Sequence, residues 1–190
     1  MSLEPPRLIA VSADDLKIVT SGILDLFQDF CKGPSLTGAN PAPLPTINKP
    51  QKQSQIGRAL IACEYSGIVR DAFTALGWEA WSCDLLPSEK PGNHYQGDVR
   101  ELLSQQWDII IAFPPCTYLC SSGMHWTVRG LRDPKLTEDA LGFVRLLLNS
   151  DCNRIALENP VGAISTRIRK PDCIIHPWQF GHHESKTTCL

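Results

Sequence analysis

Two periodicities of apolar residues alternate along the chain from residue 58 onward. Four short segments have the length and composition of buried strands, namely 59–63, 79–84, 107–113 and 154–159. Segments 67–76 and 136–149 between them predict helices, the first closed by a glycine, and 97–105 predicts a turn into a short helix. Strand, turn and helix in repeated order are typical of a parallel sheet with helices on both faces. The predicted fold class is therefore α/β.

The first 56 residues follow a different pattern. A capping-box-like Ser12–Asp15 precedes apolar residues at helical spacing, which predicts a helix over about 13–31: Leu16, Val19, Ile23, Leu26, Phe27 and Phe30. Residues 34–56 contain five prolines and few large apolar side chains, as linkers do. We therefore expect a helical extension over 1–33, a linker over 34–56 and one folded domain over 57–190.

Composition restricts the setting of the protein. The chain has no run of 18 apolar residues and no signal-peptide pattern at its N-terminus, so we expect no membrane span. Its eight cysteines form no Cys-x-x-Cys pair and several lie in strand-like runs, which favours a reducing cytoplasm over a disulfide framework. The net charge is −2, so binding to nucleic acid would require a local basic patch.

The third and fourth strands end in residues that could carry chemistry. Pro114 and Pro115 stop the third strand, because proline has no N–H for a sheet ladder, and Cys116 follows on this rigid turn. Glu158 ends the fourth strand, and carboxyl ends of parallel strands share an edge, where α/β sheets bind ligands. A thiol and a carboxyl facing one substrate fit nucleophilic addition with proton exchange. A packing cysteine is the alternative.

The first and second strands end in residues suited to a nucleotide-like cofactor. The turn 64–67 has the right position, although Gly67 is its only glycine. Asp84, at the end of the second strand, could bind both ribose hydroxyls, or it could be an ordinary strand-end aspartate. Asp98 could accept the amino group of an adenine, or it could cap the helix that starts at Val99.

The segments ACEYSG, WSCD, GDV, AFPPC and LENP, in this order, resemble the cytosine-5 DNA methyltransferases. The similarity runs from about Arg58 to Leu190 and is greatest to compact methylase-like proteins of phages and prophages. It implies a Rossmann-like fold that binds S-adenosylmethionine, in the cytoplasm of a bacterial or phage-infected cell. It also implies Cys116 as the nucleophile and Glu158 as the residue that binds the cytosine edge. The implied cofactor residues are Glu64, Tyr65, Ser66, Gly67, Asp84, Asp98 and Pro114.

The implied substrate contacts lie around and after the Pro-Pro-Cys turn. Pro115 and Asn159 flank the catalytic pair. Residues 121–135 could form a mobile loop that closes over substrate, or an ordinary solvated loop, with Trp126, Arg129 and Arg132. Arg167, Arg169 and Lys170 could contact phosphates or only face solvent. Lys186 is the nearest match to the family's later basic motif, whose arginines are replaced by Thr187 and Cys189. The spacing of His182, His183 and Cys189 fits no common zinc pattern, so no metal is expected.

The resemblance predicts methylation of carbon 5 of cytosine in DNA, as in restriction–modification systems. The same chemistry on a free cytidine nucleotide or on RNA is one alternative, and a catalytically idle nucleic-acid-binding module is another. Family members carry a target-recognition region and a last cofactor motif beyond the part matched here. We therefore expect a catalytic domain that is incomplete at its C-terminus.

Overall fold

The computed structural model describes residues 57–180 and 187–190. The predicted helix over 13–31, the linker over 34–56, the histidine pair 182–183 and Lys186 lie outside these residues. No helix in the described ranges is long and apolar enough to cross a bilayer.

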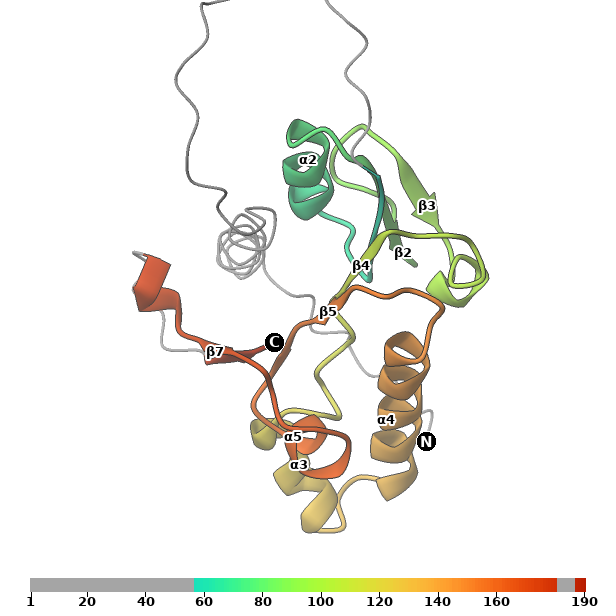
Figure 1. The fold of residues 1–190 in the computed structure, drawn as a ribbon. Helices are drawn as coiled ribbons and strands as arrows, with labels where there is room; N and C mark the ends of the chain where they lie inside the picture. Colours follow the sequence, from blue (N-terminus) through green and yellow to red (C-terminus); the bar gives the residue numbers. More distant parts are fainter. Residues whose placement is uncertain (1–56, 181–186) are drawn as a thin grey trace, which may run out of the picture.

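A five-stranded sheet is the centre of the described chain (Figure 1). Its order is β3-β2-β1-β4-β5, and every pairing is parallel. The strands are β1 (Arg58–Ala62), β2 (Glu79–Asp84), β3 (His94–Gln96), β4 (Ile109–Ala112) and β5 (Ile155–Leu157). This order is compatible with a Rossmann-like fold, and the predicted parallel α/β class is confirmed.

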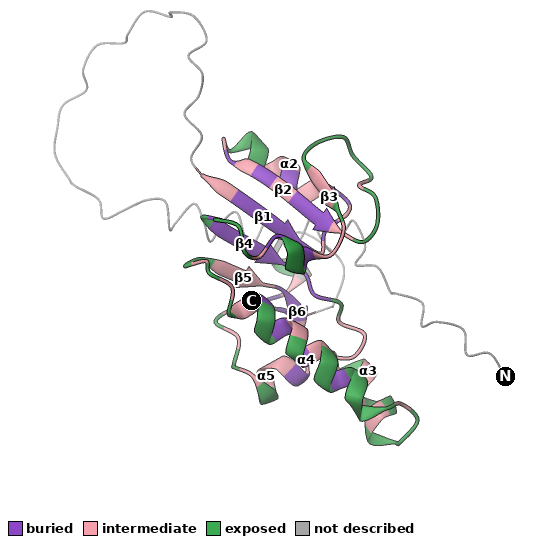
Figure 2. Ribbon diagram, turned by 90° about the vertical axis from the view of Figure 1, so that its right-hand side faces the viewer, coloured by how far each residue is buried: buried purple, intermediate pink, exposed green. Residues whose placement is uncertain are grey.

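Side chains of the central strands alternate between two cores, because successive residues of a strand point to opposite faces. On one face, Ile61 and Ile111 pack with Phe73 of α2 (Ile68–Ala75). On the other face, Leu60 and Ile110 pack with residues of η1 (Val99–Glu101) and with the end of α4 (Pro134–Leu148). Figure 2 shows the buried strands β1 and β4 between these layers. The expected helices on both faces are thus present.

A smaller antiparallel sheet follows β5, in the order β6-β8-β7. Its strands have only two residues each: β6 (Asn159–Pro160), β7 (Ile174–Ile175) and β8 (Thr188–Cys189). Pro160 lies on an edge strand, where a missing N–H costs least. Around this sheet are α3 (Ser121–Val128), α5 (Ala163–Arg167) and η2 (Pro177–Phe180).

Two sequence-based expectations about secondary structure were wrong, and one strand was missed. The strand expected over 154–159 is split, because the chain leaves the parallel sheet after Leu157 and Asn159 pairs with Cys189 instead. Residues 121–128 form helix α3 rather than a loop; none of them is buried, so no apolar periodicity revealed the helix. Strand β3 was missed because it has only three residues and lies at the sheet edge.

Arg70 fastens the turns on the β1–β2 side of the sheet. Its side chain is 1% exposed. The guanidinium donates to Asp71 Oδ1 at 2.8 and 3.0 Å, to Ser88 Oγ at 3.1 Å and to the Pro91 carbonyl at 3.1 Å. A Cβ on Gly92 would lie 2.8 Å from the guanidinium carbon, so this glycine permits the close approach. One buried cation therefore holds the loop between β2 and β3 against helix α2.

We predict that Arg70→Met lowers the free energy of unfolding by about 3–5 kcal/mol, because the buried Ser82 hydroxyl and several part-buried acceptors lose their donor. Urea denaturation monitored by circular dichroism measures the loss. Arg167→Met is the matched control: its ion pair with Glu138 is about half exposed on both sides, so the change should stay within about 1 kcal/mol. Equal losses in both variants would contradict the role given to Arg70.

Candidate active site at the carboxyl edge of the sheet

The carboxyl ends of β1 and β4 form a topological switch point. From β1 the chain crosses to β2 on one side, whereas β4 and β5 lie on the other side. Ligands of open α/β sheets bind in the crevice outside such a point. Glu64, after β1, donates its N–H to the Cys83 carbonyl at 3.1 Å, and Phe113, after β4, donates to the Ala62 carbonyl at 3.0 Å. The turns after β1 and β4 therefore begin side by side at the carboxyl edge of the sheet.

Glu64 places a buried carboxylate at the start of helix α2. The residue is 1% exposed, and its Oε1 accepts from the Ser66 hydroxyl and from the Ile68 N–H at 3.1 Å. Its Oε2 is buried with no hydrogen-bond partner among the described residues. Burial raises the pKa of Glu64, and hydrogen bonds from Ser66 and from the backbone of Gly67 and Ile68 oppose that rise. An orphaned buried oxygen of this kind needs a donor that the described residues do not supply.

Asp84 and Asp98 lie on the same side of the site. Both carboxylates raise the pKa of the Cys63 thiol at the end of β1, after the larger effect of burial, so all three residues are close. Cys63 has φ of 60°, a left-handed conformation that is uncommon outside glycine. The Asp84 carboxylate accepts the Leu86 N–H at 3.0 Å. Three acidic residues therefore converge beside the end of β1.

Asp98 acts as a helix cap in this structure, which was one of its two interpretations. Its side chain accepts the Arg100 N–H at 3.0 Å and three guanidinium contacts of 2.9, 2.9 and 2.6 Å, and this pairing lowers its pKa. A role toward adenine stays a prediction, and it would require Asp98 to share its carboxylate with Arg100.

Cys116 lies in a tight turn after β4. Its carbonyl accepts N–H donors from Leu119 and Cys120, both at 2.9 Å. Arg132 donates to the Thr117 carbonyl at 3.0 Å, and its guanidinium lies 4.9 Å from the centre of the Tyr118 ring. Arg132, expected as a nucleic-acid contact, is therefore used inside the protein to fix the turn next to the thiol.

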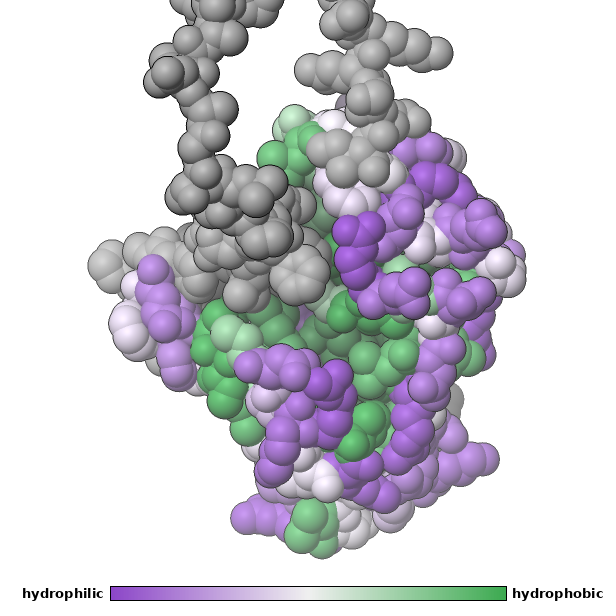
Figure 3. All heavy atoms as spheres, viewed as in Figure 1, coloured by the Kyte–Doolittle hydropathy of each residue, from purple (hydrophilic) through white to green (hydrophobic). Residues whose placement is uncertain are grey.

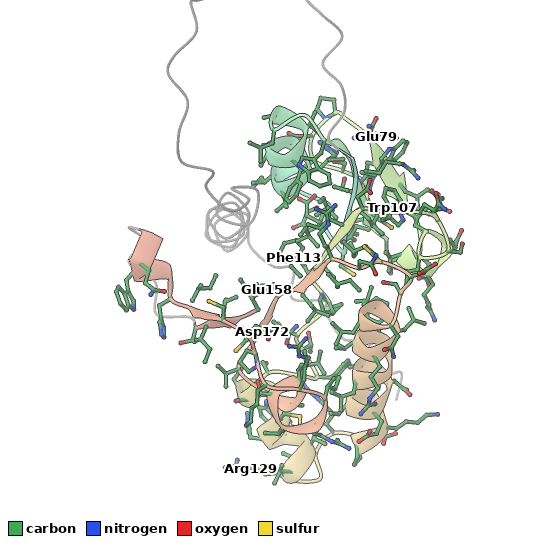
Figure 4. All side chains as sticks on the ribbon, viewed as in Figure 1. Glu79, Trp107, Phe113, Arg129, Glu158 and Asp172 are labelled. Carbon is green, nitrogen blue, oxygen red and sulfur yellow. The ribbon has the colours of Figure 1, made fainter. Side chains whose placement is uncertain are left out.

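Glu158 and Asn159 tie the end of β5 to the Cys116 turn. The Glu158 N–H donates to the Ala112 carbonyl at 2.9 Å, and the Asn159 amide donates to the Pro114 carbonyl at 2.9 Å. The Glu158 side chain is 5% exposed, and its Oε1 accepts the Thr188 hydroxyl at 3.1 Å. Figure 4 shows Glu158 next to Phe113, where β4 and β5 end. The two turns that carry the expected thiol and carboxyl are thus joined directly.

The expected phosphate contacts line two hollows of the surface, and Lys170 lines both of them. Arg129, Arg167 and Lys170 line one cleft of about 630 Å³ between α3 and α5, together with His125. Arg167 in this cleft is paired with Glu138 at 2.6 Å, and Arg169 is paired with Asp172 at 2.6 Å and lines a different groove. Trp126 on α3 is 45% exposed. Arg129 lies far from Glu158 in Figure 4, so this basic cleft is adjacent to the thiol–carboxyl pair rather than part of it.

Sequence reasoning missed two residues that organise the site. Thr188 contacts the Glu158 carboxyl, but strand β8 has two residues and gave no periodic signal. Arg70 sits on the apolar face of an amphipathic helix between Val69 and Phe73, and that buried position was the one available signal.

Comparison with protein-family models, with curated proteins and with solved structures finds no match to this chain. The resemblance to cytosine-5 DNA methyltransferases therefore stays a prediction from the motifs.

We predict that Glu64→Gln changes the pH dependence of stability. The folded pKa of Glu64 lies above its unfolded value, so the ionised carboxylate destabilises the fold as pH rises above the unfolded value of about 4.5. The glutamine variant lacks this penalty. Its free energy of unfolding, measured in urea between about pH 4 and 7.5, should rise relative to wild type as pH rises. A difference that is constant with pH would contradict the assignment.

Proposed function

We propose that this protein binds S-adenosylmethionine and methylates carbon 5 of cytosine in DNA, with Cys116 as the nucleophile. The observation that carries the proposal is the junction between the Pro114–Cys116 turn and the Glu158–Asn159 turn, joined by the Asn159 amide. The parallel sheet sets this junction next to the acidic turn after β1. A thiol, a buried carboxyl and the acidic residues that follow β1 and β2 then share one edge.

The residues present fit S-adenosylmethionine better than a phosphate-bearing cofactor. Dinucleotides place their pyrophosphate on free N–H groups at a helix N-terminus. Here Glu64 already accepts the Ile68 N–H at the start of α2, so that position repels an anion. S-adenosylmethionine carries an ammonium and a sulfonium and no phosphate. Glu64 Oε2 would accept from the ammonium, and Asp84 would accept from the ribose hydroxyls.

The chain's own residues would supply the remaining chemistry. The Cys116 thiolate would add to carbon 6 of cytosine, and the electron pair of the 5,6 double bond would move to carbon 5, while Glu158 in its protonated form donates a hydrogen bond to ring nitrogen 3. When bound, S-adenosylmethionine supplies the methyl group that carbon 5 accepts. A base then removes the carbon 5 proton, the double bond re-forms and the thiolate leaves. In duplex DNA the base must first be flipped out.

Phosphate contacts distinguish DNA from the alternative substrates. The cleft with Arg129, Arg167 and Lys170 is a basic patch in a chain of net charge −2, and it favours a polyanion over a single nucleotide. The second candidate function is a catalytically idle nucleic-acid-binding module, for which the same cleft would suffice.

Isothermal titration of the full chain with S-adenosylmethionine should give measurable binding. Glu64→Gln should weaken binding by about 10- to 100-fold, because a charge-assisted hydrogen bond in a buried site is lost. Asp139→Asn, an exposed acid on α4, is the matched control and should bind as wild type does. Equal affinities for all three proteins would remove Glu64 from the cofactor site.

Duplex DNA in which cytosine is replaced by 5-fluorocytosine should form a covalent adduct with the cofactor-loaded protein, because fluorine does not leave as the proton does. A pool of mixed sequences avoids the need to know the target, and a denaturing gel detects the adduct. Cys116→Ser should abolish it. Cys120→Ser, which changes a half-buried thiol in the same turn, should retain it.

Two other outcomes of this experiment would each support one of the alternative functions. An adduct with fluorinated nucleotide or RNA, but none with DNA, assigns the same chemistry to that substrate. DNA binding without any adduct assigns the idle binding module.

A further inference from the structure

A groove of about 500 Å³ runs along the outer edge of β5. Its apolar lining comes from the end of α4, from β5, from α5 and from the C-terminal strand: Leu148, Ile155, Leu157, Ile164, Cys189 and Leu190. In the described chain, β5 pairs only with β4. Figure 3 shows apolar side chains gathered on this face with hydrophilic residues on either side. Nothing in the mechanism proposed above uses this groove.

An open edge strand with an apolar flank is an aggregation hazard, and proteins commonly cover such an edge with a helix or a loop. We propose that residues 13–31 of the same chain cover this edge as an amphipathic helix. Their apolar positions form one stripe at helical spacing over 16–30, a length of about 21 Å at 1.5 Å per residue. A helix of this length gains most of its stability by packing that stripe on a surface.

The point where the chain enters the fold lies near the groove. Arg58 O accepts the Asp108 N–H at 2.9 Å, and Arg154, which lines the groove, donates to Asp108 O at 2.8 Å. Strand β1 is two positions from β5 in the sheet, a distance of about 10 Å. Residues 32–56 have a root-mean-square span of about 25–30 Å if flexible, so they reach the groove easily. Such a tether gives an effective concentration of about millimolar or more.

Charge also favours this occupant. The groove is lined by the basic residues Arg154, Arg169 and Lys170 and by one acid, Asp172. Residues 13–31 contain four aspartates and a single lysine: Asp14, Asp15, Asp25, Asp29 and Lys17. An acidic amphipathic helix therefore matches the groove in its apolar surface and is complementary to the basic residues around it in charge.

Photo-crosslinking in the full chain tests the proposal. A benzoylphenylalanine in place of Phe27, within the apolar stripe, should crosslink to peptides containing 153–157, 169–173 or 188–190 of the same molecule. The same group in place of Gln28, on the opposite face of the helix, is the matched control and should crosslink several-fold less to these peptides. Crosslinks that join two chains would assign the groove to a second copy and overturn the proposal, as would crosslinks to other regions.

Hydrogen–deuterium exchange of the full chain gives an independent measurement. Phe27→Asp should expose the groove, so that amides of 153–157 and 188–190 exchange about tenfold faster or more than in wild type. Gln28→Asp should leave their exchange unchanged. Equal exchange in wild type and Phe27→Asp would show that residues 13–31 do not cover the edge, and this result would leave the proposed methylation unaffected.

Discussion

The burial of β1 between β2 and β4 is the constraint on which the rest of the structure depends. Its residues Ala59 to Ala62 are wholly inaccessible to solvent, because helices cover both faces and strands pair with both edges. All neighbours run parallel to it, so every strand delivers its following turn to one edge. Cys63 takes its left-handed conformation where β1 ends, and Glu64 enters the crevice directly after it. The site is a consequence of this central strand.

At Glu64, the stability of the fold conflicts with the proposed function. A buried carboxylate with an oxygen left without a donor is unfavourable for an empty fold. Arg70, in the first turn of helix α2, fixes the surrounding loops with a fully hydrogen-bonded guanidinium, and its charge opposes the rise in the pKa of Glu64. When it binds, a cation that pairs with Glu64 would remove this destabilisation of the fold. The free energy gained in this way would add to the affinity for that ligand.

The sequence predicted the central sheet well because its strands are buried on both faces and read as apolar runs. Ile109 to Ala112 needed no partner information to be recognised. The region after Leu157 could not be predicted in this way. There the chain changes sheets within two residues, and Asn159 is fixed by a carbonyl 45 positions earlier in the sequence. Long-range polar contacts of this kind leave no periodic pattern, and the same is true of Thr188 and its contact with Glu158.

The distribution of charge resolves the apparent conflict between an acidic chain and the anionic substrate that we propose for it. Acidic residues converge beside the end of β1, where they also hold neighbouring thiols protonated: burial and then Asp84 raise the pKa of Cys83 to about 12. Basic residues gather on the other side of the switch point, between α3 and α5. Cys116 follows β4, the strand next to β1, and the Arg132 guanidinium is hydrogen-bonded to the carbonyl of the residue after it. Under the proposed function, the cofactor would therefore contact the acidic residues and the DNA would contact the basic cleft, without competing for the same charges.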